Sequence, residues 1–193
     1  MTKRLALLLT ALTALTVLTG CDAAYKKLGP EYGALPPCGV QIHVVSPAGD
    51  FNEAQKLDIQ YALAEIGLWS NRDVVYAGEV AYRSNTPNRP GHTVVAERTP
   101  PGAPYQGYAL PNKFIQIGPW YMTLASPTPN NEYGYTTFRG VFLHEAMHAI
   151  VGAEDMYNDG DGHPELIMGK GMLRRNTMNL GDVKAAVAGG CPR

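Results

Sequence analysis

The chain has no excess of either charge. Its 193 residues include 16 Lys and Arg against 17 Asp and Glu, which gives a formal net charge of −1. Surplus positive charge is what holds nucleic acid, so a DNA-binding role is disfavoured. Charged residues make up 17% and apolar residues 45% of the chain, which is the balance of a globular protein and argues against disorder. The length corresponds to one domain, and no internal repeat follows the first 20 residues.

The apolar run Leu5–Leu18 is too short to span a membrane comfortably. It follows Lys3 and Arg4, and this charged-then-apolar order is typical of a secretory signal. The run closes with Leu18-Thr19-Gly20-Cys21, which resembles the lipobox of bacterial lipoproteins, where cleavage leaves a lipidated cysteine at the N-terminus. We therefore expect residues 1–20 to be a signal peptide and Cys21 to anchor an exported protein to a membrane of the bacterial cell envelope. The alternative is an ordinary signal peptide with an incidental cysteine.

Cysteine is scarce, and the two residues after Cys21 stand far apart in the chain, at Cys38 and Cys191. They lack the spacing of metal ligands, so a zinc site made of cysteines is excluded. Because disulfides persist in exported proteins, we expect Cys38 and Cys191 to pair. Closing so long a loop stabilises a protein by about 4–5 kcal/mol in the chain-entropy model, before any strain is subtracted.

Strand patterns and helix patterns alternate after a Gly- and Pro-containing stretch, residues 21–37, which is predicted to be a tether. The domain is expected to cover residues 38–193. Alternating or β-branched residues predict strands at 40–45, 73–81, 92–96 and 113–117. A helix is predicted from Asn52 to Leu68, capped by Asp50 or Asn52. Its apolar stripe consists of Ala54, Leu57, Tyr61, Ala64 and Leu68, widened by Ile59, Ala62, Leu63 and Ile66.

A second helix is predicted to begin at Tyr135 or Thr136 and to end at Val151, with Gly152 directly after it. Beyond Arg139 its only polar side chains are His144, Glu145 and His148. A helix this apolar is buried, and buried imidazoles require partners. A last helix is predicted near residues 180–187.

The two histidines, four residues apart, lie one turn apart on the same face of a helix and can direct their imidazoles to one point. Glu145 is rotated by about 100° and reaches the rim of that point. Such an HExxH arrangement suits a zinc site in which the carboxylate takes a proton from a zinc-bound water and passes it to a leaving amine. A third ligand must then come from beyond the helix.

HExxH followed by a glycine, an acid and a later methionine resembles the metzincin metallopeptidases, and the acid in place of a third histidine is most similar to the snapalysin group. The resemblance rests on 141–171, where Gly152 to Asp155 matches the ligand segment and Met168 the methionine of the Met-turn. It implies an α+β, metzincin-like fold: a twisted, mostly parallel sheet, two long helices and a short C-terminal subdomain. It also implies one catalytic Zn2+.

The spacing departs from the metzincin pattern by one residue, because Val151 stands where the glycine is expected. A left-handed turn requires glycine and tolerates valine poorly, so the turn belongs at Gly152 and Asp155 is the preferred third ligand. Glu154 and His163 are the alternatives. The loop around His163 also contains oxygen ligands, but it lacks most of an EF-hand pattern, so Ca2+ is not expected.

The resulting expectation is a monomeric zinc endopeptidase with Glu145 as general base and acid, acting on protein or peptide substrates. The strand at 113–117 is expected to be an edge strand that holds an extended peptide by strand addition. One alternative is a gluzincin with Glu165 as third ligand, for which too little chain remains after HExxH. The other is a non-catalytic lipoprotein that binds metal or peptide on a metzincin scaffold, in which Glu145 would have no use.

Overall fold

Five strands form one sheet in the order β2-β1-β3-β5-β4. The computed structural model describes residues 28–87, 89–103, 107–119, 137–155, 167–168 and 177–193. The strands are β1 (Ile42–Pro47), β2 (Val74–Val80), β3 (Thr93–Arg98), β4 (Gly107–Leu110) and β5 (Phe114–Ile117). All neighbouring strands pair in parallel except β4, which runs antiparallel to β5. The expected α+β class and mostly parallel sheet are confirmed.

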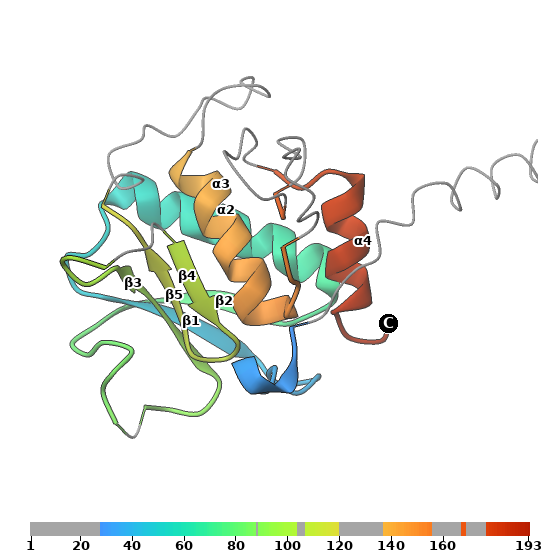
Figure 1. Cartoon of the computed structure of the whole chain (residues 1–193), viewed down its shortest axis with the longest axis horizontal. Helices are drawn as coiled ribbons and strands as arrows, with labels where there is room; N and C mark the ends of the chain where they lie inside the picture. Colours follow the sequence, from blue (N-terminus) through green and yellow to red (C-terminus); the bar gives the residue numbers. More distant parts are fainter. Residues whose placement is uncertain (1–27, 88, 104–106, 120–136, 156–166, 169–176) are drawn as a thin grey trace, which may run out of the picture.

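Two long helical segments lie side by side over one face of this sheet (Figure 1). They are α2 (Glu53–Ser70) and α3 (Phe138–Ala146), which continues as a π-helical turn, η4 (Met147–Val151). A further helix, α4 (Leu180–Ala188), packs against α2, and a 3-10 turn, η2 (Pro30–Tyr32), precedes the sheet. In the described part of the chain, none of the helices has the length and apolar character that crossing a membrane requires.

Side-chain caps explain where the helices begin. Asn52 accepts a hydrogen bond from the backbone N–H of Gln55, and Thr137 accepts one from Gly140. Each thereby satisfies a backbone donor that has no partner inside the helix. Of the two caps considered for the first helix, Asp50 and Asn52, the structure uses Asn52, and the second helix is capped by Thr137.

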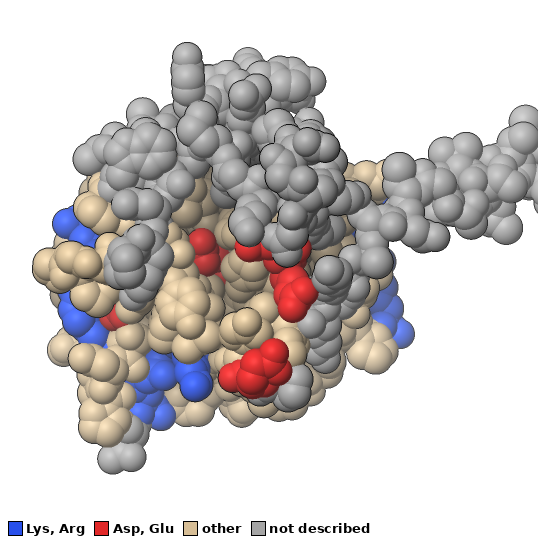
Figure 2. Space-filling model, viewed as in Figure 1, with Lys and Arg blue, Asp and Glu red and all other residues tan. Residues whose placement is uncertain are grey.

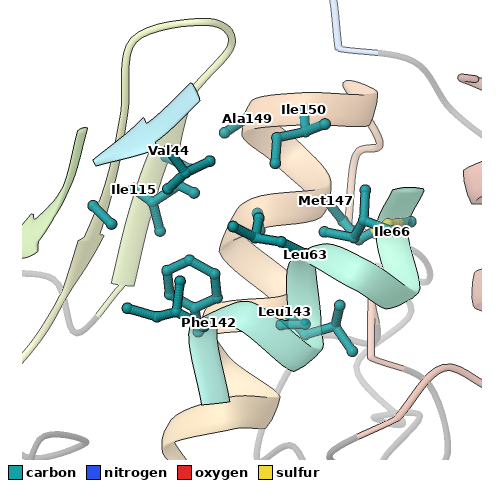
Figure 3. Packing of buried hydrophobic residues seen from close by; sticks show 14 of the residues in the cluster. Val44, Leu63, Ile66, Ile115, Phe142, Leu143, Met147, Ala149 and Ile150 are labelled. Carbon is teal, nitrogen blue, oxygen red and sulfur yellow. The ribbon is translucent and has the colours of Figure 1, made fainter. Parts of the chain in front are cut away.

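The core lies between the sheet and the two helices. Figure 3 shows Val44 and Ile115 pointing from the sheet toward Leu63 of α2 and Phe142 of α3. Burial of these side chains and their neighbours supplies the main favourable term in folding. It also fixes the last turns of α3 relative to the sheet.

The predicted apolar stripe of α2 is on the wrong face. Leu57, Tyr61 and Leu68 are 48%, 52% and 66% exposed, whereas the residues treated as a widening of the stripe, Ile59, Ala62, Leu63 and Ile66, are buried. The helix carries apolar residues on both sides, so their period alone does not say which side meets the sheet. Tyr61 instead lies under the guanidinium of Arg139, 5.2 Å from its ring centre.

The prediction that residues 113–117 form an edge strand is wrong, because β5 lies between β3 and β4. The edge on this side of the sheet belongs to β4, a strand of four residues that the sequence did not reveal, and β2 forms the opposite edge. It reverses into β5 through a tight turn in which Asn112 has a φ of 53°. A glycine-initiated strand this short gives almost no alternating pattern to detect.

The two chain ends of the domain are joined. Cys38 and Cys191 form a disulfide with Cα atoms 5.6 Å apart, which confirms the expected pairing. The buried Arg72 donates hydrogen bonds to the carbonyls of Pro36 at 2.8 Å and Gly189 at 3.1 Å. Of the predicted tether, the residues from Leu28 onward are described, and they lie against the domain.

Candidate metal centre

Three potential ligand atoms converge at the end of α3. The Nε2 atoms of His144 and His148 are 3.1 Å apart, and the Oδ1 atom of Asp155 is 3.2 Å from the first and 3.3 Å from the second. Among the described residues, these three form the one group of His, Cys, Asp or Glu side chains that could hold a metal ion.

The π-helical turn explains how Asp155 reaches the histidines. The backbone N–H of Gly152 donates to the carbonyl of Met147 at 3.0 Å, a hydrogen bond that spans five residues instead of four. A π-turn accommodates one extra residue within a helix. Gly152 then adopts a left-handed conformation, with a φ of 72°. The one-residue departure from the metzincin spacing is therefore absorbed before the glycine, and the spacing from glycine to acid is kept.

Backbone carbonyls fix the tautomer of both imidazoles. The Nδ1 atom of His144 lies 2.6 Å from the carbonyl oxygen of Ile167, and that of His148 lies 2.5 Å from that of Ala153. A carbonyl oxygen only accepts, so each Nδ1 carries a hydrogen, and in the neutral ring each Nε2 presents a lone pair. Metal-ligating histidines commonly have such a partner.

The spacing of the three atoms fits a tetrahedral ion. Two lone pairs and a carboxylate oxygen that face one another within 3.3 Å repel unless a cation or proton lies between them. Ligand atoms bound to zinc at 2.0–2.1 Å with tetrahedral angles lie about 3.3 Å apart. The arrangement on the protein is thus already close to what a zinc ion requires.

The charges in the site depend on one another. Hydrogen bonds from His144 and His148 hold the pKa of Asp155 well below its usual range, although burial opposes this. Burial disfavours a charged His144, but the hydrogen bond to Asp155, followed by the nearby charge of Glu145, outweighs it and raises the pKa of His144 to about 9. The three side chains therefore favour positive charge at the point where their atoms meet.

Glu145 is buried beside this group, with 7% of its surface exposed. Its carboxylate lies against Gly107 at the start of β4, where a Cβ atom would come within 2.9 Å of its Cδ atom and overlap Oε1. Burial raises the pKa of Glu145, and the positive charges of the histidines only partly oppose that rise. The carboxylate is consequently held at the edge strand, on the side of the metal group that faces the cleft.

Met168 is fully buried, as expected for the methionine of a Met-turn, and Ile167 beside it carries the carbonyl that holds His144. Asp182 of α4 fixes this pair of residues. Its carboxylate accepts hydrogen bonds from the backbone N–H groups of Ile167 and Met168, each at 2.9 Å, and from Asn179 at 3.0 Å. Asp182 is completely buried, and the burial raises its pKa.

The group opens into a cleft of about 390 Å³. One wall comes from β4, with Gly107, Tyr108 and Ala109, and another from the N-terminal segment, with Leu28 and Tyr32. Figure 2 shows acidic side chains exposed on this face around the end of α3.

The structure brings together most of the predicted site. His144, His148 and Asp155 converge, and Glu154 lines the cleft outside that group. His163 and Glu165 lie outside the described residues, as does the loop considered for calcium.

Sequence reasoning missed the contributions of Leu28, Tyr32, Tyr108 and Asp182. Of these, Asp182 left a signal: the pair Asn179 and Asp182 has capping-box spacing, although a capping box does not reveal a contact with a distant turn.

No protein-family model matches this chain, and comparison with curated proteins finds no significant similarity.

Proposed function

We propose that this protein is a metzincin-like, zinc-dependent endopeptidase. The observation that carries the proposal is the triangle of His144 Nε2, His148 Nε2 and Asp155 Oδ1, with sides of 3.1–3.3 Å and with both Nδ1 atoms satisfied by carbonyls. Three protein ligands with room for a fourth, exchangeable one are typical of catalytic zinc and not of structural zinc. The resemblance of HEAMH, Gly152, Asp155 and Met168 to the metzincins supports the same choice.

The zinc, when bound, supplies Lewis acidity and lowers the pKa of water in its open position. Glu145 then has two roles in succession. Its carboxylate takes the proton of the attacking water as the C–O bond forms at the peptide carbonyl, and it gives that proton to the nitrogen as the C–N bond breaks. It lines the same cleft as the three candidate ligands and lies against Gly107 of β4, the strand along which the substrate is proposed to lie.

The substrate is proposed to be an extended polypeptide that adds to the free edge of β4. Within the described sheet, β4 has a strand partner on one side only. A terminal strand is where an extended peptide adds to a sheet, and recognition through the backbone tolerates many side chains. We therefore propose strand addition at β4, because β5, the strand expected from the sequence, lies inside the sheet.

We also propose that the chain is exported and held at a membrane through a lipid on Cys21. The support is the order of Lys3, Arg4, the apolar run and the residues that precede the cysteine. Expression of Cys21→Ser should move the protein from the membrane fraction to the soluble one. A wild-type protein that is already soluble would contradict the lipoprotein assignment.

Hydrolysis is tested with Glu145→Gln, which keeps the shape of the side chain and removes its ability to carry a proton. Wild-type protein loaded with zinc should cleave casein or a quenched peptide and lose that activity with a chelator. The variant should bind zinc equally well and be slower by about 100-fold or more. Zinc binding by wild type without cleavage of a broad peptide set would favour the non-catalytic alternative.

A further inference from the structure

The N-terminal segment Leu28–Cys38 is built into the wall of the cleft. The backbone N–H of Leu28 donates to the carbonyl of Gly152 at 2.8 Å, directly after the π-helical turn. Leu28 and Tyr32 line the same cleft as His148 and Asp155. In Figure 1 this segment, coloured blue, lies beside the C-terminal end of α3. Its tip is thus attached to the backbone that carries Asp155 toward the histidines.

The C-terminal end of the segment is also held in place. Pro36 accepts a hydrogen bond from the buried Arg72, and Cys38 is covalently joined to Cys191. Between these points the side chain of Leu35 packs onto Gly152, so closely that a Cβ atom there would come within 3.0 Å of it. Because the segment is held at Leu28, Leu35 and Cys38, it keeps a fixed position relative to the metal group.

The length of chain ahead of this segment limits how far the cleft can lie from a lipid on Cys21. Six residues separate Cys21 from Leu28, so the two are joined by seven Cα–Cα steps. Seven such steps extend over about 25 Å at most. A domain of this size has a radius of gyration of about 15 Å and hence a diameter near 40 Å. The reach is shorter than the domain is wide, so the end of the cleft at Leu28 stays within about 25 Å of a lipid-bound Cys21 and cannot face the side of the domain farthest from the membrane.

We infer that the substrates are the membrane-proximal segments of other membrane-anchored proteins, cut within roughly a tether length of the bilayer surface. This inference rests on the proposed function and on lipidation of Cys21. A lipid anchor confines enzyme and substrate to one membrane surface. This raises the effective concentration of cleavage sites that lie at the same distance from the bilayer as the cleft, and it lowers that of cleavage sites outside the reach of the tether. Soluble proteins are poorer substrates for the anchored enzyme by the same reasoning.

The test uses the lipidated full-length mature protein in phosphatidylcholine vesicles. A casein peptide that the soluble enzyme cleaves is anchored to the same vesicles through polyproline spacers of 6 or 30 residues. These spacers place the site about 19 Å and about 93 Å from the lipid. Two control proteins accompany it: a soluble form beginning at Asp22, and a lipidated variant with 40 flexible Gly and Ser residues inserted between Ala23 and Ala24.

The lipidated wild type should cleave the near site about tenfold faster than the far site or more. The soluble form should cleave both at similar rates, and the variant with the insertion should lose most of the preference. Equal rates on both sites by the lipidated wild type, or a preference unaffected by the insertion, would overturn this inference and leave the peptidase intact. Failure of the soluble form to cleave any casein peptide would overturn the proposed function, and the inference with it.

Discussion

His144 and His148 are oriented by backbone groups that the sequence does not reveal. HExxH predicted that the two imidazoles would share a helix face. Because a left-handed turn requires glycine, the turn was predicted at Gly152, and Asp155, three residues later, was predicted as the third ligand. The carbonyls of Ile167 and Ala153, which hold the two Nδ1 atoms, lie in turns whose geometry depends on the whole fold. The identity of the ligands was therefore predictable from residue types, whereas their orientation was not.

Gly107 leaves the space that the carboxylate of Glu145 occupies. We predict that Gly107→Ala retains zinc binding but lowers kcat/KM by about tenfold or more, because the added methyl group displaces the proton carrier from its position. Zinc content and peptide hydrolysis, measured on the same samples, check this. Gly91→Ala is the matched control, since a Cβ atom at Gly91 meets nothing within 4 Å. Full activity in Gly107→Ala would show that Glu145 does not work from its described position.

Asp58 offers a test of stability that is independent of the site. Burial raises the pKa of Asp58 to about 6 in the folded protein, although Arg139 partly opposes this. Because the pKa is raised on folding, the group favours the folded state below its unfolded pKa near 4, and this contribution is lost as the pH rises through 6. We predict that Asp58→Asn stabilises the protein by about 1–3 kcal/mol at pH 7.5 and by only a few tenths at pH 4. Urea unfolding of wild type and Asp58→Asn at both pH values measures the difference in free energy of unfolding. An equal difference at both pH values would contradict a raised pKa of Asp58.

Among the elements, the π-helical turn is the one that brings Asp155 to the two histidines. It converts an apparent mismatch of one residue into a site with the usual spacing after the glycine. Helix periodicity predicted α3 and its end at Gly152, but a π-turn has no sequence signature of its own. The metzincin pattern raised the question of where the one extra residue is accommodated. The three-dimensional structure shows that it is accommodated in the π-helical turn.

We predict that Gly152→Ala weakens zinc binding and lowers the free energy of unfolding by about 1–3 kcal/mol. The added methyl group would be strained at a φ of 72° and would also press on Leu35. Gly49→Ala is the matched control, because Gly49 has a φ of 79° but an added Cβ atom meets nothing there. Chelator competition should show weaker zinc binding for Gly152→Ala alone. An equal loss of affinity in both variants would mean that general destabilisation causes it.

The contact between α4 and residues 167–168 leads to a second prediction for an element. Asp182→Asn replaces one of two carboxylate oxygens that together accept three backbone hydrogen bonds, so we expect a loss of stability of about 1–3 kcal/mol. Since Ile167 holds His144, zinc affinity should also fall, by about tenfold. The exposed Asp73→Asn serves as control. Unchanged zinc affinity in Asp182→Asn would show that α4 does not support the metal group.

At the scale of the whole molecule, the sequence predicted four of the five strands and all three α-helices that lie in the described part of the chain. The missed strand, β4, and the misplaced face of α2 have one cause: both depend on which neighbours surround an element, and local pattern does not contain that information. The disulfide was predictable because only two cysteines remained after Cys21. The role of the N-terminal segment as a cleft wall was not, since Leu28 and Tyr32 carry no motif.

The most direct test of the central claim is the zinc content of the soluble protein from Asp22 onward, for wild type, Asp155→Ala and Glu154→Ala. The account predicts close to one zinc per chain for wild type and for Glu154→Ala, because Glu154 lies outside the three-atom group. Asp155→Ala should lose most of its zinc under the same dialysis. Zinc retained by Asp155→Ala and lost by Glu154→Ala, or no zinc in the wild type, would contradict the assignment of His144, His148 and Asp155 as a metal centre.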